Sequence, residues 1–247
     1  TTRWVLLALA SITAFAAVSA WLTAPRLGGR MDPSATSPLG GHALVALLRD
    51  QGVEVVIAET VADAQRAARP DTLLLIAETA NTRGDALSAL AAVPGDRLLV
   101  EPTTKSRETL AAGIRRSSDG KPANAPECQL REAELAGTVD FSNADSYEQV
   151  GDTSVIRCYG GAVIRYTADG RVVTAVGSAD FMTNGALLNE GGAALAMNLA
   201  GQRSRLIWYA PQHVQGSPDA DKELGDLIPV SVTWVVLQLC VVVALLA

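Results

Sequence analysis

The sequence predicts an α/β fold with a mostly parallel sheet, an antiparallel hairpin and one transmembrane helix on each side of the domain. Helical and strand patterns alternate through the first half of the domain, as in parallel strands joined by crossover helices. Residues 72–77 form a continuous apolar run, typical of a strand buried on both faces. Residues 4–24 and 230–247 contain no charged side chain. Together these three features define the fold class.

The two uncharged segments are predicted to anchor the chain in a membrane. Residues 4–24 are about 21 residues long, enough to cross a hydrocarbon core of about 30 Å, and Trp21 suits an interfacial position. The alternative for this segment is a cleaved signal peptide, whose apolar run is usually only about 7–15 residues. Residues 230–247 reach the last residue, so we expect the sequence to stop inside or just past a second span. Arginines lie on both sides of the first span, so charge alone does not fix the orientation.

The expected domain covers residues 38–210, between a Gly- and Pro-rich linker at 25–37 and a polar connector at 211–229. Thr60 is expected to cap the second helix, because a threonine hydroxyl accepts from the first free backbone N–H groups. The expected helices have amphipathic or alanine-rich patterns and lie at 38–50, 60–68, 83–92, 104–114 and 189–200. The expected strands are short apolar runs at 53–57, 72–77, 97–100, 154–159, 162–166, 172–176 and 205–209.

Two segments differ from this simple alternation. The tight turn at 168–170 contains Asp169-Gly170 and predicts an antiparallel hairpin between the strands beside it. Residues 101–151 have weak periodicity outside the 104–114 helix, so we expect an irregular insertion there. Around this insertion, the remaining strands and helices favour a Rossmann-like or flavodoxin-like sheet, in which ligands bind beyond the carboxyl ends of the strands.

Charge and cysteine content restrict the environment of the domain. The chain has 26 acidic and 20 basic residues and a net charge of −6, which argues against binding to nucleic acid and against a polybasic contact with lipid. Cys240 lies in the second predicted span. Cys128 and Cys158 lie in the domain, where a disulfide fits an oxidising, extracytoplasmic location; two unrelated thiols are the alternative.

Three stretches of the chain resemble a bacterial membrane family described as domain of unknown function 4350. They are residues 37–55, the L-L-L-I-A strand at 73–77, and residues 177–196, which read G-S-A-D-F-M-T-N-G-A-L-L-N-E-G-G-A-A-L-A. The resemblance implies a Rossmann-like domain related to class I glutamine amidotransferase-like folds, placed between membrane spans. It also implies partners among other membrane proteins, including a MoxR-type AAA ATPase.

An amidotransferase-like fold requires a nucleophile on the sharp turn after a central strand. Here Glu78-Thr79-Ala80-Asn81 follows the 72–77 strand, and no Cys or Ser stands there. The chain has only two histidines, His42 and His213, and neither has a second His or Cys at metal-binding spacing. The sequence therefore favours neither a catalytic triad nor a zinc site, and we expect no cofactor.

A weaker candidate is a polar ligand site at the carboxyl ends of the strands. Its oxygen-bearing side chains are those of Glu78, Asp180, Asn184, Asn189 and Glu190. Such groups can bind a divalent cation, but turn and capping roles explain them as well. In particular, Asn189 and Glu190 suit the N-cap and first turn of the helix that follows.

Two functions follow from these observations. The first is a non-catalytic binding or assembly component of a cell-envelope complex, held in the bacterial cytoplasmic membrane by two spans with its main domain outside the cytoplasm. The second is a degenerate or unrecognised amidotransferase-like hydrolase that acts on an envelope substrate through Glu78, Asp180 or Glu190. The missing nucleophile favours the first.

Overall fold

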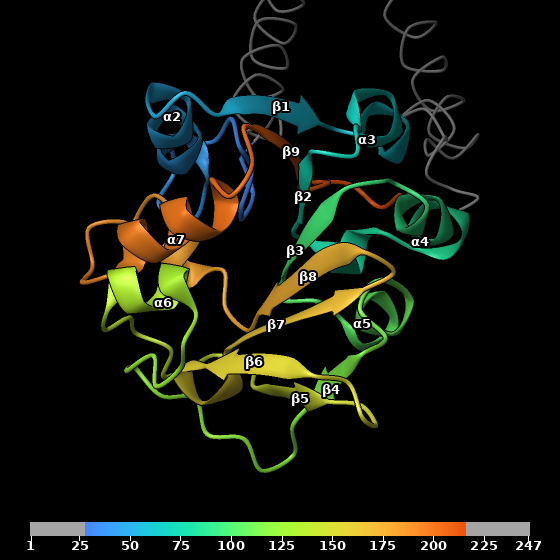
Figure 1. Ribbon diagram of the computed structural model, residues 1–247. Helices are drawn as coiled ribbons and strands as arrows, with labels where there is room; N and C mark the ends of the chain where they lie inside the picture. Colours follow the sequence, from blue (N-terminus) through green and yellow to red (C-terminus); the bar gives the residue numbers. More distant parts are fainter. Residues whose placement is uncertain (1–27, 216–247) are drawn as a thin grey trace, which may run out of the picture. The chain divides into compact units, whose positions relative to one another are not determined.

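A seven-stranded sheet forms the centre of the domain in the computed structural model, which describes residues 28–215 (Figure 1). Its strands, in sheet order, are β1 (Glu54–Ala58), β9 (Arg205–Tyr209), β2 (Leu73–Ile76), β3 (Asp96–Val100), β8 (Arg171–Val176), β7 (Val163–Ala168) and β6 (Val155–Cys158). The strands from β1 to β8 in this order pair in parallel, and β7 and β6 pair antiparallel. The mostly parallel α/β sheet is therefore confirmed.

The last strand of the domain lies inside the sheet rather than at its edge. Leu206 of β9 pairs with Val55 of β1 on one side and with Leu73 of β2 on the other. This order differs from the flavodoxin order, in which the strands run 2-1-3-4-5. The segment before the first helix also reaches β9, because the fully buried Trp208 donates a hydrogen bond of 3.0 Å to the carbonyl of Met31.

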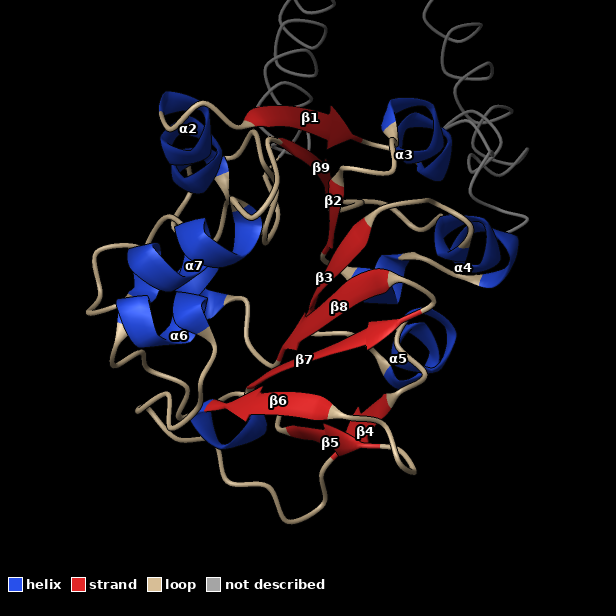
Figure 2. Cartoon of the chain, viewed as in Figure 1, coloured by secondary structure: helices blue, strands red, loops and turns tan. Residues whose placement is uncertain are grey.

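Helices cover both faces of the sheet (Figure 2). One face carries α2 (His42–Asp50), α6 (Arg131–Ala136) and α7 (Gly192–Ala200), and the other carries α3 (Val61–Ala67), α4 (Gly84–Ala91) and α5 (Thr104–Leu110). The apolar run of β2 explains this arrangement, because all four of its residues are buried. Leu73 and Leu75 join the core on the α2 side, whereas Leu74 and Ile76 join the core on the α3 side.

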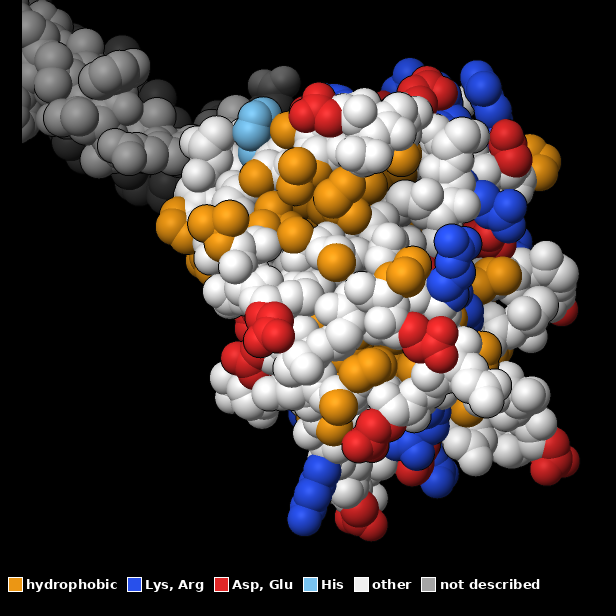
Figure 3. Space-filling model, turned by 60° about the vertical axis from the view of Figure 1, so that its left-hand side comes forward, with side chains coloured by type: hydrophobic (Ala, Val, Ile, Leu, Met, Phe, Trp, Pro, Cys, Tyr) orange, Lys and Arg blue, Asp and Glu red, His pale blue; other side chains and the backbone are white. Residues whose placement is uncertain are grey.

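The outer surface over α2, α6 and α7 carries apolar patches with acidic side chains between them (Figure 3). Exposed leucines on or beside these helices include Leu47 on α2, Leu135 on α6 and Leu188 ahead of α7. Leu188 is 97% exposed. Single exposed leucines are common on soluble surfaces and do not by themselves define an interface.

Local sequence signals account for several boundaries. Thr60 caps α3 in a capping box, accepting from the Asp63 N–H while the Asp63 carboxylate accepts from the Thr60 N–H. Asp169 and Gly170 both have positive φ, 51° and 72°, as a type I′ turn between β7 and β8 requires. The predicted cap and hairpin are thus confirmed.

Three predicted helix boundaries were wrong. The helix expected from residue 38 begins at His42, with Gly41 as its N-cap, and α5 ends at Leu110 because the chain enters β4 (Ile114–Arg116) soon after. Asn189 and Glu190 lie in a turn before α7, and its N-cap is Gly191. Gly191 has φ 69°, and a Cβ there would lie 2.1 Å from the carbonyl oxygen of Thr138, so only glycine fits.

Residues 101–151, expected to be an irregular insertion, contain both regular and irregular parts. α5 packs on the main core, and β4 pairs with β5 (Tyr147–Gln149) in a separate two-stranded antiparallel sheet. The chain between β4 and β5 has no regular structure apart from α6. A disulfide between Cys128, in this segment, and Cys158 joins the segment to the end of β6. This disulfide fixes the irregular part of the segment to the main sheet.

The predicted spans at 4–24 and 230–247 lie outside the described residues, as does most of the predicted connector. Within residues 28–215, no helix is long and apolar enough to span a bilayer. Residues 28–37, from the predicted linker, pack on the domain, and Met31 is fully buried.

Candidate functional site

Charged and polar side chains gather where three parallel strands end. Glu78 lies just after β2, Glu101 directly follows β3, and Ser178 and Asp180 follow β8. Because β2, β3 and β8 are parallel and β3 is paired with the other two, their carboxyl ends lie at one edge of the sheet. Open α/β sheets bind their ligands at this edge.

Arg30, from the segment before α2, holds two of these carboxylates together. Its Nη1 donates to Glu101 Oε2 at 2.6 Å, and its Nη2 donates to Glu101 Oε1 at 2.8 Å and to Asp180 Oδ1 at 2.7 Å. Glu101 Oε1 also accepts from the backbone N–H of Ala179 at 2.9 Å. We call Arg30, Glu78, Glu101 and Asp180 the Arg30 cluster.

The backbone of this cluster adopts an unusual conformation. Glu78 has φ 50° and Glu101 has φ 46°, so both residues that follow their strands are left-handed; Met31, beside Arg30, has φ 57°. For a residue with a side chain this conformation costs roughly 1–2 kcal/mol. Such strain persists only where surrounding contacts impose it, and it concentrates at functional sites.

The charges of the cluster alter its pKa values. Burial raises the pKa of Glu78, Arg30 lowers it and Glu101 raises it, and the net result is a raised pKa. Burial lowers the pKa of Arg30, but the carboxylates of Glu101 and Asp180 outweigh this effect and raise it overall. Within the described residues the Glu78 carboxylate has no hydrogen-bond partner, so it is the least satisfied group of the cluster.

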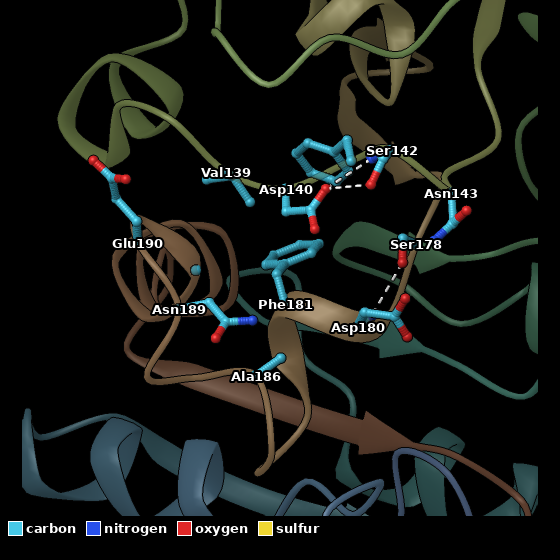
Figure 4. Close-up of a pocket in the computed structure, with 12 residues that line it drawn as sticks. Val139, Asp140, Ser142, Asn143, Ser178, Asp180, Phe181, Ala186, Asn189 and Glu190 are labelled. Carbon is cyan, nitrogen blue, oxygen red and sulfur yellow. Dashed lines mark hydrogen bonds between the residues drawn. The ribbon is translucent and has the colours of Figure 1, made fainter.

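A small pocket adjoins the cluster at Asp180, with a volume of about 50 Å³ (Figure 4). Its floor is apolar and its rim is polar. It is lined by Val139, Asp140, Phe141, Ser142, Asn143, Ser178, Asp180, Phe181, Ala186, Asn189, Glu190 and Gly192. The volume suits a few waters or the end of one side chain, because pockets for drug-sized ligands measure about 300–1,000 Å³.

The rim of this acidic pocket is negative. Asp140, Asp180 and Glu190 line it, and no basic side chain of residues 28–215 does. A hydrogen bond from the Ser142 hydroxyl, then one from its N–H, lower the pKa of Asp140 and keep it ionised. In Figure 4, the carboxylates of Asp180 and Glu190 point outward on opposite sides of the pocket.

The floor of the acidic pocket consists of packed aromatic rings. The rings of Phe141 and Phe181 meet edge to face, with their centroids 5.4 Å apart. The ring of Phe141 also packs against that of Tyr159, and these two centroids are 4.8 Å apart. Both phenylalanines are nearly fully buried. The packed rings therefore form a rigid apolar wall, and the carboxylates of the rim are the groups that can pair with an ammonium or guanidinium.

The structure separates the sequence-predicted site residues into three groups. Asp180, Asn189 and Glu190 line the acidic pocket, and Glu78 belongs to the adjoining Arg30 cluster. Asn184 instead joins two segments of backbone. Its Oδ1 accepts from the N–H of Ala43 at 2.8 Å, and its Nδ2 donates to the carbonyls of residues 35 and 37 at 2.8 and 2.7 Å.

Sequence reasoning missed Arg30, Glu101 and Asp140. Glu101 follows an apolar strand in the same way as Glu78, so the signal that identified Glu78 could have identified it too. Arg30 gave no such signal, because it lies in a segment that has the composition of a linker. Asp140 lies in the irregular segment, whose path over the sheet no pattern specifies.

Glu78 occupies the left-handed turn between β2 and the short helix at Thr79–Asn81. Among residues 28–215, no three His, Cys, Asp or Glu side chains are placed to hold a metal ion. A glutamate at this turn can bind a cation or transfer a proton.

Comparison with known proteins agrees with a membrane context. The family described as domain of unknown function (DUF4350) matches residues 33–200. A Mycobacterium tuberculosis protein, described as uncharacterized membrane protein Rv3691, is 50% identical over 246 residues. That match covers 99% of this chain but only 65% of the relative, so the chain spans less than two thirds of the relative's length. No solved structure matches the chain.

Proposed function

This chain belongs to the family described as domain of unknown function (DUF4350), and we propose that it is a membrane-anchored, non-catalytic binding module of the cell envelope. Its acidic pocket receives a lysine or arginine side chain of a partner protein. The observation that carries this proposal is a carboxylate rim over an aromatic floor, with no basic residue of the described chain lining it. Its place at the carboxyl edge of the sheet supports the same conclusion.

The size and charge of the acidic pocket select the kind of ligand. About 50 Å³ admits the end of a side chain but not a whole substrate. Asp180 uses Oδ1 to bind Arg30, and its side chain is 59% exposed, so its second oxygen is accessible to a partner. Ionised Asp140 lines the same pocket, where it can pair with an incoming cation.

We propose that two spans anchor the module and that the domain lies outside the cytoplasm. The name of the M. tuberculosis relative supports the membrane location, and the disulfide supports an oxidising compartment. A membrane-impermeant amine reagent tests the orientation, because Lys105 and Lys121 are both exposed. Labelling in intact spheroplasts is expected, and labelling only after permeabilisation would contradict the orientation.

Partner capture tests the binding function. We propose other membrane proteins as partners, acting together with a MoxR-type AAA ATPase system. The full chain is solubilised from native membranes in mild detergent, as wild type, as Asp140→Asn and as Asp180→Asn. Glu134→Gln is the matched control, because Glu134 is exposed on α6 and has no ion pair within the described chain.

Both aspartate variants should lose a protein that the wild type and the Glu134→Gln control retain. Raised salt should weaken the same association, because it depends on exposed charges. Equal recovery of every co-purifying protein from all four chains would refute recognition at the acidic pocket.

A second candidate function is a hydrolase of the amidotransferase-like fold, and one observation favours it. Glu78 combines a left-handed turn, a raised pKa and a nearby guanidinium, properties that suit a general acid or base. If the chain is a hydrolase, Glu78→Gln abolishes function in cells while partner capture persists. If Glu78→Gln cells are unaffected, this second function is wrong.

A further inference from the structure

A second cavity lies at the opposite edge of the sheet, where β3 and β8 begin. It measures about 300 Å³ and is bounded by the ends of α4 and α5 and by the β7–β8 turn, which lies beside α5 in Figure 1. Its polar lining includes Arg97 on β3, Arg171 at the start of β8, and Tyr166 on β7. We call it the Arg97 cavity.

Arg97 is an unusual residue for the interior of a protein. Its side chain is only 7% exposed, and within residues 28–215 it forms no ion pair with a carboxylate. Buried arginines are almost always paired, because an isolated buried charge is costly. The neighbouring carboxylate, that of Asp96, is already bound to Arg203 and to the N–H of Val172.

The backbone satisfies only part of this guanidinium. Nη1 donates to the carbonyl of Leu110 at 2.9 Å, and Nη2 donates to that of Ala91, so Arg97 caps the carboxyl ends of α5 and α4. These helix ends carry partial negative charge, which offsets part of the free-energy cost of burying the guanidinium. A guanidinium has five N–H donors, however, and the buried Nε of Arg97 has no acceptor in the described structure.

A second cation lies close by. Burial lowers the pKa of Arg97 to about 10, and the positive charge of Arg171 adds to this effect. Arg171 is half-buried and has no ion pair in the described part of the chain. Asp169 also lines the cavity, but it is exposed at the turn and affects the pKa of Tyr166 rather than that of Arg97.

Tyr166 supplies a third donor. Its hydroxyl oxygen accepts from the N–H of Gly113 at 3.3 Å, which leaves the hydroxyl hydrogen free to donate. Burial raises the pKa of Tyr166, so the phenol is neutral. Two guanidiniums and one phenol, from three adjacent strands of the sheet, thus surround a cavity at the lower size limit for a small molecule.

We propose that the Arg97 cavity binds a phosphate group, either as inorganic phosphate or as the monoester of a small molecule. Donors on two strands, with a buried guanidinium on a third beside them, suit a tetrahedral oxyanion better than a planar carboxylate, which a single guanidinium can bind through two parallel hydrogen bonds. Arg171 and Tyr166 bind the oxygens, and Arg97 provides buried positive charge. The cavity is separate from the acidic pocket, so the two proposals can fail independently.

Calorimetry and thermal unfolding of the purified full chain test this site. The probes are inorganic phosphate and glycerol 3-phosphate, with sodium chloride at matched ionic strength as the reference and succinate as a dicarboxylate. The variants are Arg171→Gln and Tyr166→Phe. Arg97 itself is left unchanged, because its removal would also free the ends of α4 and α5. Arg131→Gln is the control, since Arg131 is exposed on α6, on the other face of the sheet.

One or both phosphates should bind the wild type and the Arg131→Gln control and raise their unfolding temperature beyond the chloride reference. Arg171→Gln should weaken binding roughly ten- to a hundredfold, as expected for a charge-assisted hydrogen bond. Tyr166→Phe should weaken it less. A competition experiment distinguishes the two sources of the phosphate group. If a short-chain phosphatidic acid displaces glycerol 3-phosphate more effectively than inorganic phosphate does, the source is a lipid headgroup. If it displaces glycerol 3-phosphate less effectively, the source is a soluble molecule.

Three results would overturn the proposal. One is the absence of binding by either phosphate. Another is phosphate binding that Arg171→Gln leaves unchanged, which would place the ion elsewhere. The third is binding of succinate in preference to both phosphates, which would assign the cavity to carboxylates.

Discussion

Asn184 joins three parts of the domain, and its removal should destabilise the fold rather than impair a site. Its Oδ1 accepts from the N–H of Ala43 in the first turn of α2, whose own N-cap, Gly41, has no side chain to offer. Its Nδ2 donates to the carbonyls of Ala35 and Ser37. One side chain therefore caps a helix and fixes the segment before it.

The expected loss in Asn184→Ala can be estimated from these contacts. Each net hydrogen bond contributes about 1 kcal/mol, but the bond to Ser37 is exposed and water replaces it. The free energy of unfolding should fall by about 2–3 kcal/mol. For a domain of this size, that loss lowers the unfolding temperature by roughly 4–12 °C. Equilibrium urea unfolding, followed by circular dichroism and tryptophan fluorescence, measures it.

Asn143→Ala is the matched control, because Asn143 is exposed beside the acidic pocket and makes no side-chain hydrogen bond to the described residues. It should change the free energy of unfolding by less than about 0.5 kcal/mol. If Asn184→Ala costs no more than the control, the structural role of Asn184 is wrong and its place in a ligand site must be reconsidered.

Three further outcomes are expected. Because the pKa of Glu78 is raised in the fold, its ionised form destabilises the domain. Glu78→Gln should therefore have a larger free energy of unfolding than wild type at pH 7, and this difference should disappear below about pH 4.3. A constant gap in a pH series of unfolding curves would contradict this. Reduction of the disulfide should lower the free energy of unfolding by about 3–4 kcal/mol, since it closes a loop of 30 residues; unchanged urea midpoints with and without reductant would count against it. Glu132→Gln should cost about 1–3 kcal/mol, because it removes the carboxylate that pairs with the partly buried Arg165, which keeps, among the described residues, only its hydrogen bond to Thr174. Glu148→Gln breaks an ion pair at the surface and should cost clearly less than Glu132→Gln, so equal midpoints for the two variants would refute the difference.

Short-range chemistry made most of the elements predictable. The continuous run at 72–77 gave β2, the Asp-Gly turn gave the β7–β8 hairpin, and Thr60 gave the start of α3. These signals lie within a few residues of the element they determine. The start of α7 was missed because Gly191 is required by a carbonyl of Thr138, which is distant in the sequence.

The candidate site was only partly predictable for the same reason. Glu78 and Asp180 follow strands, and the parallel pairing of those strands brings their ends to one edge. Arg30 reaches that edge only because the segment around Met31 packs beside Trp208. The sequence likewise did not predict that Arg97 is buried without a carboxylate partner among the described residues, because an arginine in an apolar strand gives no sign of whether a carboxylate faces it.

The place of β9 has a consequence for synthesis of the chain. Glu54 of β1 contacts Arg205 of β9 across 151 residues, and β1 has no other neighbour in the sheet. Until the ribosome has released β9, β1 and β2 have no strand between them, and both expose edges that can pair with other nascent chains. We therefore expect the domain to fold after translation has passed Tyr209, and nascent chains arrested before that residue to depend on chaperones.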